Sequence, residues 1–128
     1  MRPFEEALAA ELAGLLRAGV PVRGLRLTVR EMVVTRFERG PLGAREVGDA
    51  VESAVRAACR LVRELDAPDE VVEAVCRSAL EAVRGHGGES ARWLSEAMGA
   101  VDAVLAELAR ERAAEPTWRW LARRLPDW

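Results

Sequence analysis

Residues 44–65 read AREVGDAVESAVRAACRLVREL, and this stretch decides the fold. Its apolar residues recur every three or four positions, at Val47, Val51, Ala54, Ala58, Leu61 and Leu65. This spacing follows the 3.6-residue turn of an α-helix, so these side chains share one face, and Arg and Glu occupy the opposite face. The stretch therefore predicts a long amphipathic helix whose apolar stripe is buried against other helices.

Three other segments carry the same helical period between residues that end helices. We expect helices over residues 4–18, 67–84 and 89–113, because Gly or Pro interrupts the chain between these segments. Asp66 precedes the second of them and is a residue type that caps helix N-termini well. The connections are short, so we expect successive helices to be antiparallel neighbours.

The segment 25–39 is ambiguous. Leu25, Leu27 and Val29 alternate as in a β-strand, but the alternation stops at the next residue. Thr28 and Glu31 have the spacing of a capping box, and Leu27 and Met32 occupy the two positions of a hydrophobic staple. We favour a helix that begins near Thr28, with a strand as the alternative.

These elements predict an all-α protein with a compact four- to five-helix bundle. We expect the bundle to comprise residues 1–115, and residues 116–128 to be a Trp/Arg-rich C-terminal segment, either a short amphipathic helix or a tail, that packs on it. We find no apolar run long enough to cross a membrane and no secretory signal. Cys59 and Cys76 are therefore expected to be reduced core thiols, and we expect a cytoplasmic location.

The composition points away from catalysis. The sequence has no Lys or Tyr and a single histidine, His86, in the glycine-rich stretch 85–88. A Schiff-base lysine and a two-histidine zinc site cannot form within one such chain. His86 and its glycines could present backbone amides to an anion, but such a stretch is first of all a turn between helices. We expect no catalytic residue, no metal site and no cofactor.

The C-terminal stretch, EPTWRWLARRLPDW, holds three of the four tryptophans. If residues 117–125 are helical, Trp118, Leu121 and Leu125 share one face. Trp and Arg are enriched where proteins bind one another. We therefore expect partner contacts at Trp118, Arg119, Trp120, Leu121, Arg124, Leu125 and Trp128. The alternatives are that this segment covers the protein's own core, or that it lies on a membrane or granule surface.

A second candidate site is basic. It comprises five arginines that could contact an anion, namely Arg23, Arg26, Arg30, Arg36 and Arg39. They suggest nucleic-acid association as an alternative function, although the net charge of −2 argues against it. The function that the sequence favours is a non-enzymatic interaction or scaffold protein. It would bind a protein partner or further copies of itself through the Trp/Arg-rich segment.

Overall fold

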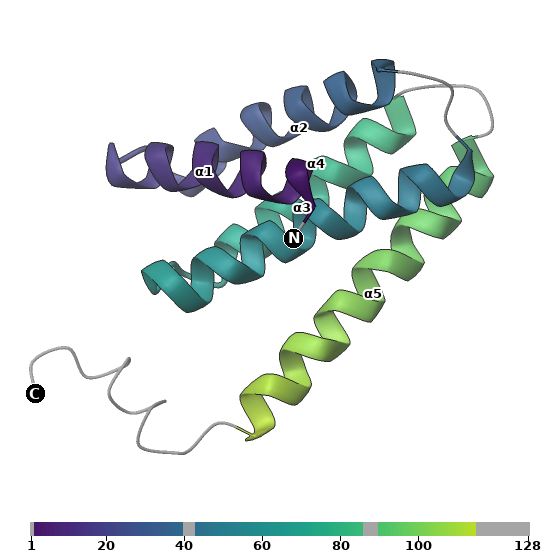
Figure 1. Ribbon diagram of the computed structural model, residues 1–128. Coiled ribbons are helices and arrows are strands. Elements are labelled where there is room, and N and C mark those ends of the chain that lie inside the picture. The colour runs from purple at the N-terminus through teal and green to yellow at the C-terminus, as the bar shows by residue number, and fades with distance from the viewer. Residues whose placement is uncertain (1, 40–42, 86–89, 115–128) are drawn as a thin grey trace, which may run out of the picture.

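The computed structural model describes residues 2–39, 43–85 and 90–114, which form five α-helices and no strand (Figure 1). The predicted all-α bundle is therefore confirmed. The predicted C-terminal helix and His86 lie outside the described residues. None of the described helices is both long and apolar enough to cross a membrane. The helices are α1 (Pro3–Arg17), α2 (Val22–Glu38), α3 (Ala44–Leu65), α4 (Glu70–Gly85) and α5 (Ser90–Ala114).

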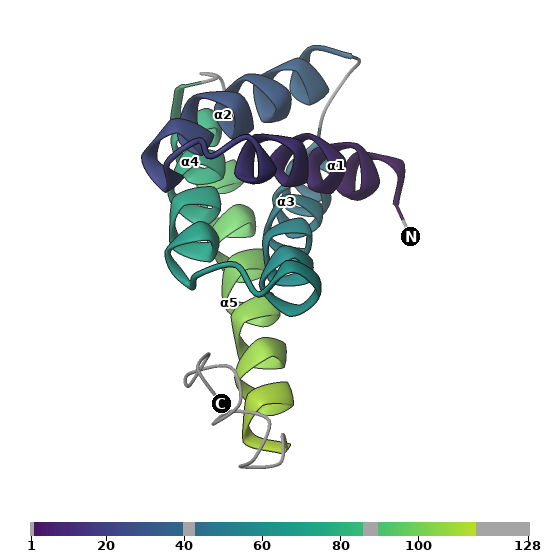
Figure 2. The ribbon, with the colours of Figure 1, turned by 90° about the vertical axis from the view of Figure 1, so that its left-hand side faces the viewer.

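The helices form three layers. The hairpin of α3 and α4 lies in the middle, the hairpin of α1 and α2 covers one side, and α5 covers the other (Figures 1 and 2). Successive helices run in opposite directions, as the short connections predicted. The most extensive contacts nevertheless join helices that run parallel and are two apart in the sequence, α3 with α5 and α2 with α4.

Helix α3 is the centre of the bundle, because it contacts all four other helices. Half of its 22 residues are buried, and they surround the helix on several sides rather than on one narrow stripe. Many of them are small, and this lets neighbouring helices approach closely. The last predicted core position, Leu65, is 38% exposed, because the helix passes the edge of the bundle there. The fully buried residues are Val47, Val51, Ala54, Val55, Ala57 and Ala58.

Helix α2 confirms the helix that we favoured for residues 25–39 over a strand, but it corrects where that helix begins. It begins at Val22 rather than near Thr28, so both the capping box and the hydrophobic staple were wrong. Pro21 occupies the N-cap position, and its carbonyl accepts a hydrogen bond from Gly24 N–H at 2.8 Å. The helix buries a residue in every turn, at Leu25, Val29, Val33 and Phe37. Packing against α4 therefore outweighs the β-propensity of this segment.

The link between α3 and α4 also differs from the prediction. Asp66 adopts a left-handed backbone conformation, with φ of 53°, and ends α3 instead of capping the next helix. Helix α4 begins at Glu70, three residues later than expected. An Asp tolerates this conformation better than most residues. The short connection then turns the chain back along α3.

The helix assignment of α2 makes a direct prediction. In a strand Leu25 and Leu27 would share one face, but in α2 Leu25 is fully buried and Leu27 is 65% exposed. We expect Leu25→Ala to lower the free energy of unfolding by about 2–5 kcal/mol. The matched variant Leu27→Ala should change it by less than about 0.5 kcal/mol. Urea unfolding measures both, and equal losses would contradict the helix.

Candidate functional site

The structure separates the five predicted anion-binding arginines into two groups on α2. Arg23, Arg26 and Arg30 lie on one side of the helix, and a turn of 100° per residue places Arg36 and Arg39 about 140° away. Arg26 forms an ion pair with Glu81 of α4. Arg30 reaches the C-terminal end of the same helix, where one guanidinium nitrogen lies about 3.7 Å from the point that a Cβ atom would occupy if Gly85 carried a side chain. These two arginines thus connect α2 to α4 instead of forming part of one basic strip.

Arg36 and Arg39 line a groove of about 750 Å³ between α1 and α2. Its apolar part is formed by Pro3, Phe4, Ala7 and Met32. Its polar rim consists of Glu31, Thr35 and Arg36 of α2 and of Arg39, which directly follows the helix. The groove therefore combines an apolar surface with two positive charges and one negative charge.

The course of α1 and α2 explains where this groove lies. The two helices are joined by a short link, diverge from it, and are farthest apart at the start of α1 and the end of α2 (Figures 1 and 2). The side of α2 that carries Val33 and Phe37 is buried in the core. The side chain of Met32, the residue directly before Val33, is only partly buried. The diverging ends leave the groove open to solvent.

The arginines of this groove have no acidic partner among the residues that the structure describes. Arg36 is partly buried and Arg39 is exposed. Neither forms an ion pair or a side-chain hydrogen bond with any residue in the described ranges 2–39, 43–85 and 90–114. On a chain with a net charge of −2, this is a local positive site next to an apolar surface.

A second, smaller groove lies between α4 and α5 and has a volume of about 480 Å³. Its lining is apolar, with Val72, Cys76 and Leu80 from α4 and Leu105 and Leu108 from α5. Two ion pairs border it, Asp69 with Arg112 and Glu73 with Arg77. The charges on this border are thus balanced, in contrast to the groove between α1 and α2.

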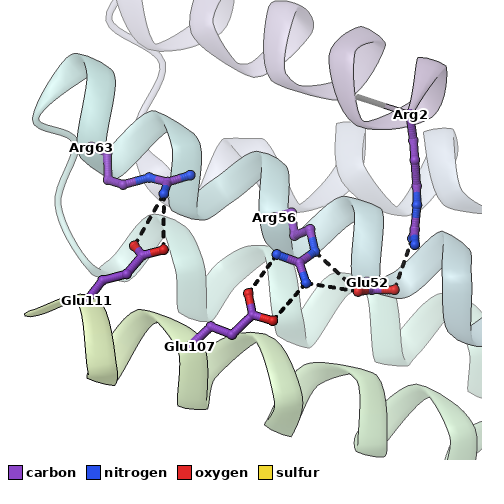
Figure 3. Close-up of polar contacts among 6 residues, drawn as sticks. All are labelled: Arg2, Glu52, Arg56, Arg63, Glu107 and Glu111. Atoms are coloured by element: carbon purple, nitrogen blue, oxygen red, sulfur yellow. Dashed lines mark hydrogen bonds and ion pairs between the residues drawn. The ribbon is translucent and has the colours of Figure 1, made fainter.

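The most extended polar cluster of the described residues joins α3 to both parallel neighbours (Figure 3). Arg56 donates to Glu52, at 3.0 Å, and to Glu107 of α5, at 2.8 Å. Arg2 reaches Glu52 from the start of α1, at 3.0 Å. Two turns further along α3, Arg63 pairs with Glu111 of α5 at 3.2 Å. This cluster fixes the register of three helices, and each of its carboxylates is neutralised by an arginine.

The charges of this cluster shift the pKa values of its members. Burial opposes ionisation of Glu52, but hydrogen bonds from Arg2 and Arg56 outweigh it and lower the pKa of the carboxyl. Hydrogen bonds from Arg56 also lower the pKa of Glu107. The hydrogen bond to Glu107 raises the pKa of Arg56 above its already high ordinary value. All three groups are therefore held in their charged forms, which suits a structural cluster rather than proton transfer.

Both cysteines carry free thiols of low reactivity. Burial raises the pKa of Cys59 and raises the pKa of Cys76 to about 11. Because the thiolate is the reactive form, neither side chain is activated as a nucleophile. In the described part of the chain, no cluster of three or more His, Cys, Asp or Glu side chains could hold a metal ion.

The Trp/Arg-rich residues that the sequence singled out, 118–128, lie outside the described residues. The sequence alone indicated Arg36 and Arg39 but not the apolar surface beside them. Pro3, Phe4 and Ala7 come from another helix, and no spacing within the sequence relates them to α2. Comparisons with protein-family models, curated proteins and solved structures give no match for this chain.

The lowered pKa of Glu52 predicts a pH-dependent contribution to stability. Because the folded pKa lies below the ordinary value, the contribution is present above that value and is lost as the pH falls through the folded pKa. We expect Glu52→Gln to cost roughly 1 kcal/mol at pH 7 and less at pH 3.

Urea unfolding at the two pH values measures this difference. The control is Glu38→Gln, which changes an exposed carboxylate outside the cluster and should leave the pH dependence as in the unmodified chain. A Glu52→Gln chain that loses the same stability at pH 3 as at pH 7 would show that the arginines do not hold Glu52 ionised.

Proposed function

We propose that this chain is a non-enzymatic interaction module that binds an acidic amphipathic helix of a partner protein between α1 and α2. The observation that carries the proposal is the groove itself, in which an apolar surface at Phe4 and Met32 lies beside Arg36 and Arg39. An apolar groove with charges on its rim is a common way to bind an amphipathic helix. The partner's apolar face would cover Phe4 and Met32.

The dimensions and charges of the groove support a helical ligand. Residues 31–39 of α2 extend over roughly 12 Å, which matches two to three turns of a helix packed alongside. A guanidinium group can bind a carboxylate through two parallel hydrogen bonds. Because Arg36 and Arg39 have no acidic partner within the described residues, Asp or Glu on the incoming helix would provide one.

Nucleic-acid association is less well supported. Such binding needs several cations that follow a phosphate backbone. Here Arg26 is paired with Glu81 and Arg30 lies against the end of α4, so only part of the predicted basic strip is available.

The proposal predicts charge-selective binding of helical peptides. The probes are labelled 18-residue peptides that carry Leu at helical spacing and Glu beside the leucines, and versions in which Arg replaces Glu. Fluorescence anisotropy should show binding of the acidic set. We expect Arg36→Glu with Arg39→Glu to weaken that binding at least about tenfold, since opposite charges are replaced by like charges.

The matched control is Arg23→Glu with Arg45→Glu, which makes the same change in net charge with two exposed arginines outside the groove. Its affinity should stay within about twofold of the unmodified chain, because exposed distant charges are screened. Equal losses in the two double variants would show a non-specific charge effect. Absence of binding by every acidic peptide would also refute the proposal.

A further inference from the structure

The groove between α1 and α2 carries its charges in a fixed order along its length. Glu31, Thr35 and Arg39 follow one another at four-residue spacing, so they form a row along the side of α2 that borders the groove. Measured along the helix axis, Glu31 lies roughly 7.5 Å from Arg36 and roughly 12 Å from Arg39. The groove is therefore negative at one end and positive at the other.

The positive end coincides with the open end of the groove. Because α1 and α2 are antiparallel, counting outward from the link between them places Pro3 level with Arg36. Arg39 therefore lies beyond the start of α1, where the two helices are farthest apart (Figure 1). Glu31 lies further in, past Ala7. A ligand helix that lies along the groove would meet the two arginines at one end and the carboxylate at the other.

Glu31 can act on such a ligand directly. Its side chain is exposed, and it forms no ion pair or side-chain hydrogen bond with any residue in the part of the chain that the structure describes. A carboxylate of the ligand would be repelled beside Glu31, whereas a cation there would be attracted. The inner end of the groove thus has the opposite charge preference to the open end.

From this order we infer that Glu31 determines which acidic helices the groove accepts. The preferred ligand carries carboxylates at positions i and i+3, opposite Arg39 and Arg36, and a Lys or Arg at position i+7, opposite Glu31. These three positions share one face of a helix and span roughly the same length as the charges of the groove. The inference rests on the proposed function, because it concerns the same site. It replaces a uniformly acidic ligand by one whose charge changes sign along its length.

Two labelled 18-residue peptides test this inference on the full-length chain. Both carry Leu at helical spacing and two Glu three residues apart in the N-terminal half, where the helix dipole favours acidic residues. Seven residues after the first Glu, one peptide has Lys and the other has Glu. Fluorescence anisotropy measures both affinities. We expect the unmodified chain to bind the Lys peptide at least about threefold more tightly than the all-Glu peptide.

The decisive variant is Glu31→Lys, which replaces the negative charge at the inner end of the groove by a positive one. We expect it to reverse the order, so that the all-Glu peptide binds at least about threefold more tightly than the Lys peptide. Circular dichroism checks that the variant is folded, as expected for a change at an exposed side chain on a helix.

The matched control is Asp102→Lys, which makes the same change in net charge at an exposed carboxylate on α5, in the opposite outer layer. It should keep the preference of the unmodified chain. Equal binding of the two peptides by the unmodified chain, a preference that Glu31→Lys leaves unchanged, or the same reversal in both variants would overturn the role of Glu31. Each of these outcomes leaves the proposed function in place. Failure of both peptides to bind the unmodified chain would refute the proposed function, and this inference with it.

Discussion

The burial of α3 on several sides is the constraint on which the rest of the structure depends. A helix with half of its residues buried cannot be covered by one neighbour, so α1, α4 and α5 are all held against it. Ala54, Ala57 and Ala58 lie in this core, and their small side chains permit close approach of the surrounding helices. The Arg56 cluster then connects α3 to α1 and α5 in a parallel register.

The same arrangement produces the two grooves. Helices α1, α2 and α5 form the outer layers, and each uses one face to cover the middle hairpin. The sides of these outer helices are less completely buried. Met32, beside α1, is therefore only partly buried, and Leu105, beside α4, is exposed. The grooves differ in charge, since the arginines of one lack partners among the described residues and those of the other are paired. This difference is the reason for assigning the acidic ligand to the groove between α1 and α2.

The sequence predicted the elements better than their arrangement. The period of residues 44–65 identified α3 at its correct bounds, because a wide apolar face leaves a clear signal in one segment. The predicted start of α2 was wrong because it rested on a local capping pattern at Thr28. The contacts with α4, which stabilise the observed helix, are tertiary and leave no such local pattern. The dominance of parallel pairs could not be predicted, since connection lengths constrain only successive helices.

The candidate site was predictable only in part, for the same reason. Arg36 and Arg39 stand out in the sequence as cations, but the pairing of Arg26 with Glu81 depends on which helix lies beside α2. The apolar half of the groove comes from Phe4 on α1, which is distant in sequence. A binding surface built from two diverging helices has no signature within either of them.

The central claim is that the surface between α1 and α2 binds a helical, acidic ligand. The most direct measurement is nuclear magnetic resonance of the ¹⁵N-labelled full-length chain during titration with an acidic amphipathic peptide. We expect the amide shifts to concentrate in residues 3–7 and 31–39, which form the groove. Shifts that concentrate instead along α4 and α5, or that spread evenly over all arginine-containing segments, would contradict it.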